Sequence, residues 1–192
     1  MSGVRIGLLF GSFNPVHIGH LILAEHFATR TDLAEVWLVV SPHSPFKAVA
    51  DLLPDSERLR LVELALAGNP RLRAEAIEFG LPRPSYTIAT LDALRQRHPT
   101  HDFVLLMGAD NLPGLPRWQE SARLLAEVDI YVYPRPGTEI QDVARFPRVQ
   151  VLQAPLLDIS ATYIRESLRA GRSIRYLVPA AIEKELHRVF AM

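Results

Sequence analysis

The chain has 192 residues, of which 48% are apolar and none is cysteine. It can therefore bury a core, but it cannot form a disulfide framework or a cysteine-ligated metal site. Lysine and arginine together total 21, as do aspartate and glutamate, so the basic excess of a duplex-binding protein is missing. No apolar run approaches the roughly 20 residues of a membrane helix, and no signal-peptide pattern is present. We therefore expect a cytoplasmic protein with no nucleic-acid and no membrane partner.

Short apolar runs alternate with amphipathic stretches along the whole sequence. Strands are predicted over residues 4–10, 36–40, 72–76, 103–107, 128–133 and 149–152. Helices are predicted over residues 17–29, 55–67, 86–97, 119–126, 160–170 and 179–190, and loops over 48–54, 78–85 and 134–137. In the second helix, Leu59, Val62 and Leu66 form the apolar stripe. This alternation predicts an α/β fold of one domain, 1–192, with a Rossmann-like, doubly wound parallel sheet.

The segment GSFNPVHIGH, residues 11–20, follows the first predicted strand and leads into a helix. A turn before a helix exposes unpaired backbone N–H groups, which bind anions together with the helix dipole. Gly11 and Ser12 let a phosphate approach the backbone closely. His17 and His20 lie on one face of the helix start, where both imidazoles can donate to the same anion. Ligands of open α/β sheets bind beyond the carboxyl ends of the strands, which is where this segment is expected.

Two other interpretations of the histidine pair stay open. His17 and His20 could be surface residues or helix caps. They could also share a metal ion, although no acidic neighbour completes a ligand set. Their spacing behind a strand and a glycine turn favours the anion site.

A second segment, DISATYIR at 158–165, places small hydroxyl groups and a cation at a helix start. Ser160 and Thr162 can cap the helix. They can also surround a phosphate chain together with Arg165, whose guanidinium offers a fork of donors. The presence of HIGH at 17–20 in the same α/β chain favours the phosphate interpretation.

These two segments together resemble the paired HxGH and ISSTxxR signatures of the nucleotidylyltransferase superfamily. They read HIGH at 17–20 and ISATYIR at 159–165, with Ala161 in place of the middle serine. The resemblance runs from residue 5 to about residue 190. It implies a fold of the nucleotidylyltransferase type, with a C-terminal helical part, about 158–192, packed on the domain and closing the ATP site.

Four further segments are most similar to the bacterial nicotinate-nucleotide adenylyltransferase family within that superfamily. They are SPHSPFK (41–47), PSYTIATL (84–91), MGADN (107–111) and PRW (116–118). This resemblance implies an enzyme of NAD biosynthesis. It would transfer AMP from ATP to nicotinate mononucleotide and release deamido-NAD and pyrophosphate.

The resemblance also implies roles for individual residues. The attacking phosphate monoester is already anionic at pH 7, so positioning and electrostatic stabilisation should carry the catalysis. Mg²⁺ would enter with ATP as cofactor, held by phosphates and water, with no metal ligands from the protein. The implied catalytic residues are His17, His20, Arg165 and Lys47. The implied ATP contacts are Gly11, Ser12, Phe13, His17, His20, Gly108, Asp110, Ile159, Ser160, Thr162 and Arg165.

The mononucleotide pocket is implied in the same way. Trp118 would stack on the pyridine ring, since a flat indole suits a flat ring. Thr87 would meet the nicotinate carboxylate at a helix N-terminus. The full implied set is Ser12, His43, Lys47, Tyr86, Thr87, Asp110 and Trp118.

Several alternatives remain open from the sequence. Many family members have an aromatic residue where Gln119 follows Trp118, so preference for the acid over the amide mononucleotide is undecided. A phosphopantetheine adenylyltransferase shares the signatures but lacks PSYT and GADN…W. A nucleotide-binding module without catalysis would bind ATP and release no pyrophosphate. A tRNA synthetase fragment would need a KMSKS-like lysine loop and a basic surface, which are absent. The oligomeric state is undetermined.

Overall fold

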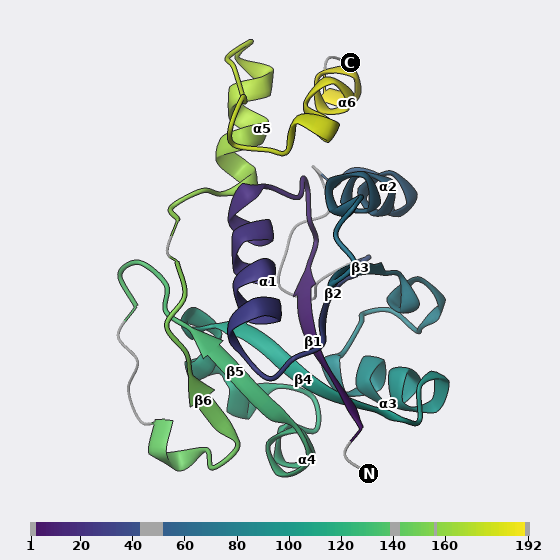
Figure 1. The fold of residues 1–192 in the computed structure, drawn as a ribbon, viewed down its shortest axis with the longest axis vertical. Helices are drawn as coiled ribbons and strands as arrows, with labels where there is room; N and C mark the ends of the chain where they lie inside the picture. The colour runs from purple at the N-terminus through teal and green to yellow at the C-terminus, as the bar shows by residue number, and fades with distance from the viewer. Residues whose placement is uncertain (1–2, 43–51, 139–142, 156, 191–192) are drawn as a thin grey trace.

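Six parallel strands form a single sheet in the order β3-β2-β1-β4-β5-β6 (Figure 1). The computed structural model describes residues 3–42, 52–138, 143–155 and 157–190. Strands β1 and β4 pair with each other, and the strand order runs outward from them in both directions. The predicted doubly wound α/β sheet is confirmed. The strands are β1 (Val4–Gly11), β2 (Glu35–Val40), β3 (Leu72–Glu75), β4 (His101–Gly108), β5 (Asp129–Tyr133) and β6 (Val149–Val151).

Helices connect the strands and cover both faces of the sheet (Figure 1). The α-helices are α1 (Ile18–Arg30), α2 (Asp55–Leu66), α3 (Thr87–Arg97), α4 (Ser121–Glu127), α5 (Ala161–Arg169) and α6 (Ala180–Phe190). Three 3₁₀ segments are η1 (Ile77–Gly80), η2 (Ala109–Arg117) and η3 (Val143–Arg145). Among the described residues, no helix combines the length and the apolar character needed to cross a bilayer.

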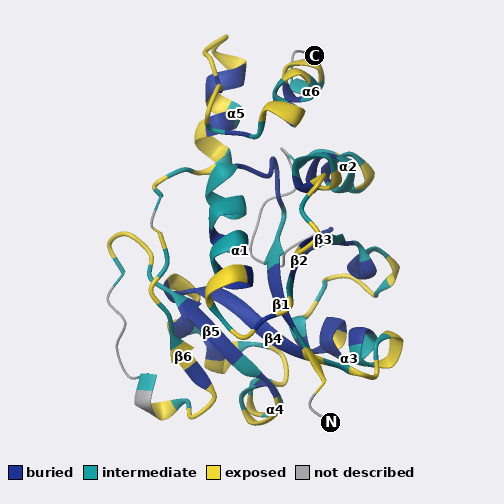
Figure 2. Cartoon of the chain, in the orientation of Figure 1, coloured by how far each residue is buried: buried dark blue, intermediate teal, exposed yellow. Residues whose placement is uncertain are grey.

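Successive side chains of the central strands enter two separate cores, as the period of two in a strand requires. Leu38, Val104 and Leu106 join the core beneath α1, α2, α5 and α6. Trp37 and Leu105 join the core beneath α3 and α4. The central strands are accordingly buried along most of their length (Figure 2). This two-sided burial explains why the strands are continuous apolar runs in the sequence.

Two segments differ from the sequence prediction. Residues 78–85 were predicted to be loop, yet η1 forms over Ile77–Gly80 because Ile77 and Glu78 are both buried. The helix predicted from residue 119 begins at Ser121, because η2 occupies Ala109–Arg117. Pro113 and Pro116 lack the N–H that an α-helix would need there.

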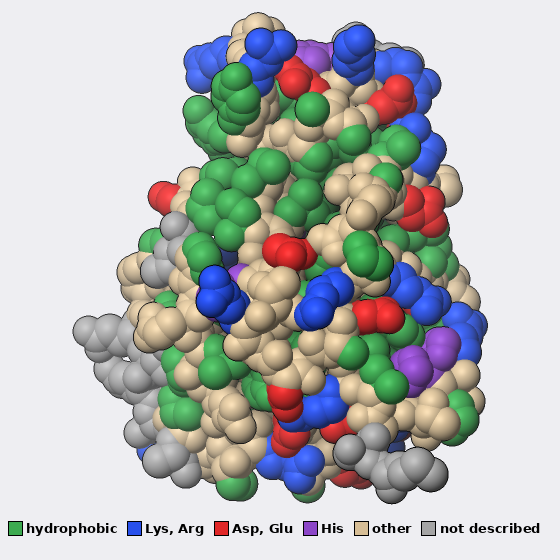
Figure 3. Space-filling model, in the orientation of Figure 1, with side chains coloured by type: hydrophobic (Ala, Val, Ile, Leu, Met, Phe, Trp, Pro, Cys, Tyr) green, Lys and Arg blue, Asp and Glu red, His purple; other side chains and the backbone are tan. Residues whose placement is uncertain are grey.

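The last two helices stand at the end of the molecule where α1 begins (Figure 1). Their buried residues Ile164, Ile182 and Leu186 belong to the same core as α1 and α2. The backbone N–H of Ile18 donates to the carbonyl of Leu177 at 2.9 Å, which ties this region to the start of α1. Basic and acidic side chains are mixed at this end, as they are over the rest of the face in Figure 3.

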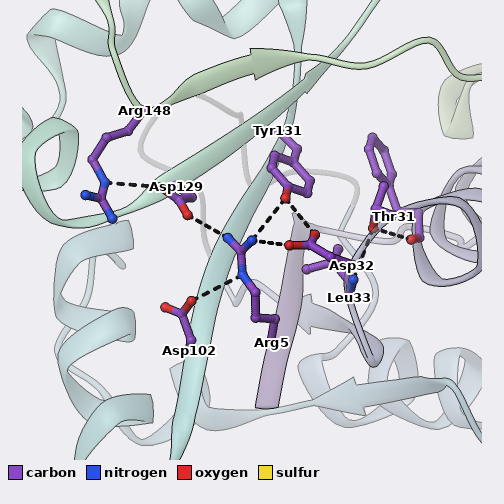
Figure 4. Close-up of polar contacts among 9 residues, drawn as sticks. Arg5, Thr31, Asp32, Leu33, Asp102, Asp129, Tyr131 and Arg148 are labelled. Carbon is purple, nitrogen blue, oxygen red and sulfur yellow. Dashed lines mark hydrogen bonds and ion pairs between the residues drawn. The ribbon is translucent and has the colours of Figure 1, made fainter. Parts of the chain in front are cut away.

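Arg5 joins the amino-terminal ends of three strands (Figure 4). Its guanidinium forms ion pairs with Asp32, with Asp129 at 2.6 Å and with Asp102 at 3.2 Å. Tyr131 donates its hydroxyl to Asp32 at 2.7 Å, and burial with this bond raises the pKa of Tyr131 to about 12. One cation therefore pairs with three carboxylates at the edge opposite the predicted site, and Arg148 pairs with Asp129 as well.

Replacement of Arg5 should destabilise the fold without touching the site. In Arg5→Met, three carboxylates lose their common partner, and we expect a loss of about 1.5–3 kcal/mol in the free energy of unfolding. Urea unfolding followed by circular dichroism measures this loss. Arg30→Met, which removes an exposed arginine from the end of α1, is the control and should stay within about 0.5 kcal/mol of the parent. Equal stability of the two variants would contradict the role of Arg5.

Candidate functional site

The loop between β1 and α1 makes a tight turn at the carboxyl edge of the sheet. Phe13 is buried and has φ of +45°, in the left-handed region. A Cβ on Gly11 would lie 2.9 Å from the ring of Phe13, so this turn requires glycine there. The Phe13 ring in turn meets His20 edge to face, with 5.0 Å between ring centroids. The turn thereby fixes the position of the second histidine.

The two histidines lie on one face, as the i, i+3 spacing predicts, and the structure shows that their rings stack. Their ring centroids are 3.7 Å apart and the planes differ by 26°. The backbone N–H of His17 donates to Nδ1 of His20 at 3.3 Å. Because Nδ1 accepts a hydrogen bond, a neutral His20 carries its proton on Nε2. That atom can donate to an anion.

His17 is a neutral imidazole near pH 7. It stands directly before α1 and is buried, with 5% of its surface exposed. Burial, with a smaller contribution from the charge of Arg135, lowers the pKa of His17 to about 4. Its Nδ1 is buried and has no hydrogen-bond partner among the described residues. A Cβ on Gly19 would lie 3.1 Å from this ring, which explains the small residue between the histidines.

Arg165 connects the second motif to the histidine loop. From α5, its guanidinium donates to the carbonyl of Asn14 at 2.8 Å and to Thr162 at 3.3 Å. Its Nε is buried and finds no hydrogen-bond partner in the described parts of the chain. Ile159 also lies close to Gly19, since a Cβ added to Gly19 would be 4.0 Å from the Cβ of Ile159. The structure therefore brings together the two motifs that the sequence separates by 140 residues or so.

Ser160 is a helix cap in this structure. Its Oγ accepts a hydrogen bond from the backbone N–H of Tyr163 at 3.1 Å, at the start of α5. The capping interpretation of Ser160 is therefore confirmed. Its hydroxyl hydrogen is still able to donate, so contact with a phosphate stays a prediction.

Asp110 and Arg135 meet beyond the carboxyl ends of β4 and β5. The Nε of Arg135 lies 3.6 Å from Oδ1 of Asp110. A Cβ on Gly108 would come within 2.3 Å of that Oδ1 and 3.1 Å of Arg135 Cγ, so a larger residue there would displace these two side chains. Arg135 also lies over the ring of Tyr133, at 5.9 Å from its centroid.

Sequence reasoning missed Arg135 as a site residue. It sits in the segment 134–137, which was assigned only as loop. Its influence on the pKa of His17 shows that its charge is close to the histidine pair. The available signal was its position, two residues after the end of β5 and hence at the edge where β1 and β4 also end.

Three of the residues predicted for the mononucleotide, Tyr86, Thr87 and Trp118, lie at the start of α3 and the end of η2. Thr87 is the first residue of α3, as predicted, and Tyr86 directly precedes it. Trp118 directly follows η2 and is half-buried against the core beneath α3 and α4. Glu78 lies beneath this region and accepts a hydrogen bond from Thr90 at 2.7 Å. His43 and Lys47 fall outside the described residues.

Glu78 is a second residue that the sequence did not single out. Its carboxyl is 1% exposed, and burial raises its pKa, which the hydroxyl groups of Thr90, Ser41 and Ser85 oppose. Ser41 follows β2 and Ser85 precedes α3. Oε2 of Glu78 and Oγ of Ser85 are buried and have no hydrogen-bond partner among the described residues.

The described residues contain no group of three or more histidine, aspartate or glutamate side chains that could hold a metal ion. Asp110 is the carboxylate at this edge, and Arg135 lies beside it. These side chains fit a divalent cation that is carried by phosphate groups better than one held by a protein cage.

Residues 8–167 match the model of the cytidylyltransferase-like family. The chain belongs to that family. It is 48% identical over 186 residues to a protein of Bacteroides fragilis, covering 97% of this chain and 92% of that protein. It is 47% identical over 181 residues to a protein of Cytophaga hutchinsonii, covering 94% of each. Both are named as probable nicotinate-nucleotide adenylyltransferases, so the resemblance drawn from the sequence is confirmed.

A solved structure agrees on the fold. The nicotinic acid mononucleotide adenylyltransferase of Plasmodium falciparum, in complex with NaAD, superposes with a TM-score of 0.78 and covers 97% of each chain. Its sequence is only 18% identical. The shared architecture therefore persists where most side chains differ.

The neutral His17 predicts a dependence of stability on pH. The unfolded chain takes up a proton on His17 near pH 6.5, and the folded protein does so only near pH 4. The free energy of unfolding should therefore fall as the pH drops through this window, with a His17 share of up to about 3 kcal/mol. Urea unfolding across the window, for the parent and for His17→Gln, measures this share. The same pH dependence in both proteins would contradict the prediction.

Proposed function

We propose that this chain transfers the AMP group of ATP to nicotinate mononucleotide and releases pyrophosphate. The proposal rests on one observation. Arg165 donates to the carbonyl of Asn14, in the loop that carries the stacked His17–His20 pair, at the carboxyl edge of the sheet. Membership of a family whose close relatives are named for this reaction supports it. The family uses ATP, and we assign Mg²⁺ as the accompanying cation.

The reaction needs charge stabilisation rather than a base. A phosphate oxygen of nicotinate mononucleotide attacks the α-phosphorus of ATP, and the bond from that phosphorus to the bridging oxygen breaks. Pyrophosphate leaves with the bonding electron pair. The nucleophile is an anion already, so the barrier comes from bringing two anions together and from charge that builds up on the phosphate oxygens.

The site offers donors of two kinds for that charge. His17 is neutral, and Nδ1 of His20 accepts a hydrogen bond from the backbone, so each imidazole in its neutral form has one N–H with which to donate. Arg165 and Arg135 supply the positive charge. Mg²⁺, held by the phosphates and water, would neutralise part of the charge on the phosphate chain. We propose that Gly11, Ser12, Phe13, Gly108, Asp110, Ile159, Ser160 and Thr162 complete the ATP contacts, as the family resemblance implies.

The other half of the site would bind the mononucleotide. Trp118 is half-buried with part of its indole accessible, which suits stacking on a pyridine ring. Thr87 opens α3, where free backbone N–H groups favour the nicotinate carboxylate. We propose Ser12, His43, Lys47, Tyr86 and Asp110 as further contacts. The C-terminal helices, packed beside the start of α1, would close the ATP side. The cytoplasmic location stays a prediction.

Pyrophosphate release with ATP and Mg²⁺ tests the proposed function. Nicotinate mononucleotide should be a strong substrate, nicotinamide mononucleotide a weaker one, and phosphopantetheine inactive. The matched control is His20→Ala, which should lower kcat by about 100-fold or more, since a donor to the reacting phosphates is lost. Preference for nicotinamide mononucleotide would show that the specificity of the pocket around Gln119 is assigned wrongly. Near-normal turnover in His20→Ala would contradict the placement of the site.

Trp118 separates binding of the two substrates. In Trp118→Ala, stacking on the pyridine ring is lost, and KM for the mononucleotide should rise by about 10-fold while KM for ATP changes little. Trp118→Phe keeps an aromatic face and is the control, with a smaller rise. Steady-state kinetics with each substrate varied in turn gives both constants. A larger rise in KM for ATP than for the mononucleotide would contradict the assignment of Trp118 to the mononucleotide half of the site.

A further inference from the structure

Arg58 is a charged side chain buried completely within the fold. It lies in the first turn of α2 and is 0% exposed. Burial lowers its pKa, and the neighbouring carboxylate of Asp55 opposes that effect. Because a guanidinium loses its proton only far above neutral pH, Arg58 stays charged at pH 7. Such a group must be fully hydrogen-bonded to be tolerated.

Its partners account for the whole guanidinium. Nε donates to the carbonyl of Leu53 at 3.0 Å. One terminal nitrogen donates to the carbonyls of Ser12 at 2.6 Å and Ser41 at 2.8 Å. The other donates to the carbonyl of Pro42 at 3.2 Å and to Asp55 at 2.5 Å. Five N–H groups thus meet five acceptors, four of which are backbone carbonyls.

Those carbonyls belong to the segments that form the site. Ser12 lies in the turn before the histidine pair, and Ser41 and Pro42 begin the SPHSPFK segment. Leu53 lies on the far side of residues 43–51, just before α2. The Arg58 guanidinium is therefore hydrogen-bonded both to the loop that follows β1 and to the two ends of the connection between β2 and α2.

A second set of bonds extends this connection to Arg165. The backbone N–H of Leu53 donates to Oδ1 of Asn14 at 3.1 Å, and Arg165 donates to the carbonyl of Asn14 at 2.8 Å. Asn14 is itself buried. A continuous path of bonds therefore leads from Arg58 through Leu53 and Asn14 to the guanidinium that the proposed function places on ATP.

We infer that Arg58 is a positioning residue, which acts through the backbone of the β1 and β2 loops to align the phosphate-binding groups. This inference rests on the proposed function. Stability alone gives little reason for such a group, because well-packed apolar residues often replace buried ion pairs without loss. Fixed geometry gives a clear reason, since a displacement of about 1 Å in a catalytic group can cost 100-fold in rate.

The test compares Arg58→Lys with Arg60→Met at a temperature where circular dichroism shows both proteins to be folded. Lysine keeps the charge but has one nitrogen, which cannot reach carbonyls spread over four residues. We expect kcat/KM of Arg58→Lys to fall by about 10- to 100-fold, with kcat lowered as well as KM raised. Arg60 lies on the same helix, is half-exposed and pairs with Glu57 and Glu185, so Arg60→Met should keep the parent's constants.

Two further measurements keep the inference testable. Calorimetric titration with ATP alone should show weaker binding by Arg58→Lys, whether or not nicotinate mononucleotide is the true acceptor. If Arg58→Lys does not fold, Asp55→Asn takes its place, since it removes the negative charge that orients the guanidinium towards its carbonyl acceptors. It should lower kcat/KM by roughly threefold to tenfold. Parental kinetics and ATP affinity in the folded variant would overturn the inference. A parent that binds ATP without turnover would contradict the proposed function instead.

Discussion

The parallel pairing of β1 with β4 determines where this molecule can bind a ligand. From β1 the chain turns to the face covered by α1, and from β4 it turns to the face covered by η2 and α4. Two neighbouring strands that send their chains to opposite faces leave a crevice between them. The histidine pair follows β1, and Gly108 with Asp110 lies at the end of β4. Every residue proposed for ATP depends on that divergence.

Local sequence patterns predicted most of the fold, and their failures have a common cause. Apolar runs such as 36–40 and 103–107 identify buried parallel strands because such strands are apolar on both faces. The 3₁₀ segments η1 and η2 carry no such pattern. Their helical turns exist because Ile77, Leu112 and Leu115 pack into a core formed by distant strands. The conformation of these segments depends on tertiary burial, which cannot be inferred from a short stretch of sequence.

The site could be predicted only where its residues are neighbours in sequence. His17 with His20, and Ser160 with Arg165, are recognisable because the spacing within one turn of a helix carries the meaning. Arg58 shows the opposite case. The stripe predicted for α2 contained Leu59, whereas the structure buries Arg58 completely and leaves Leu59 partly exposed. A cation on a helix normally faces water, and its true partners are carbonyls, which have no signature in a sequence.

The charge balance of the site follows from where its positive groups are placed. Overall the chain has as many basic as acidic residues, so net charge does not attract a nucleotide. A buried, neutral His17 adds no charge either. The positive charge near the histidine pair comes from Arg165, which donates to the carbonyl of Asn14, and from half-exposed Arg135, whose Nε lies 3.6 Å from Asp110. A guanidinium already fixed in place loses little further freedom when a phosphate arrives. Binding selectivity can thus arise from two oriented arginines and two oriented imidazoles in a protein without net charge.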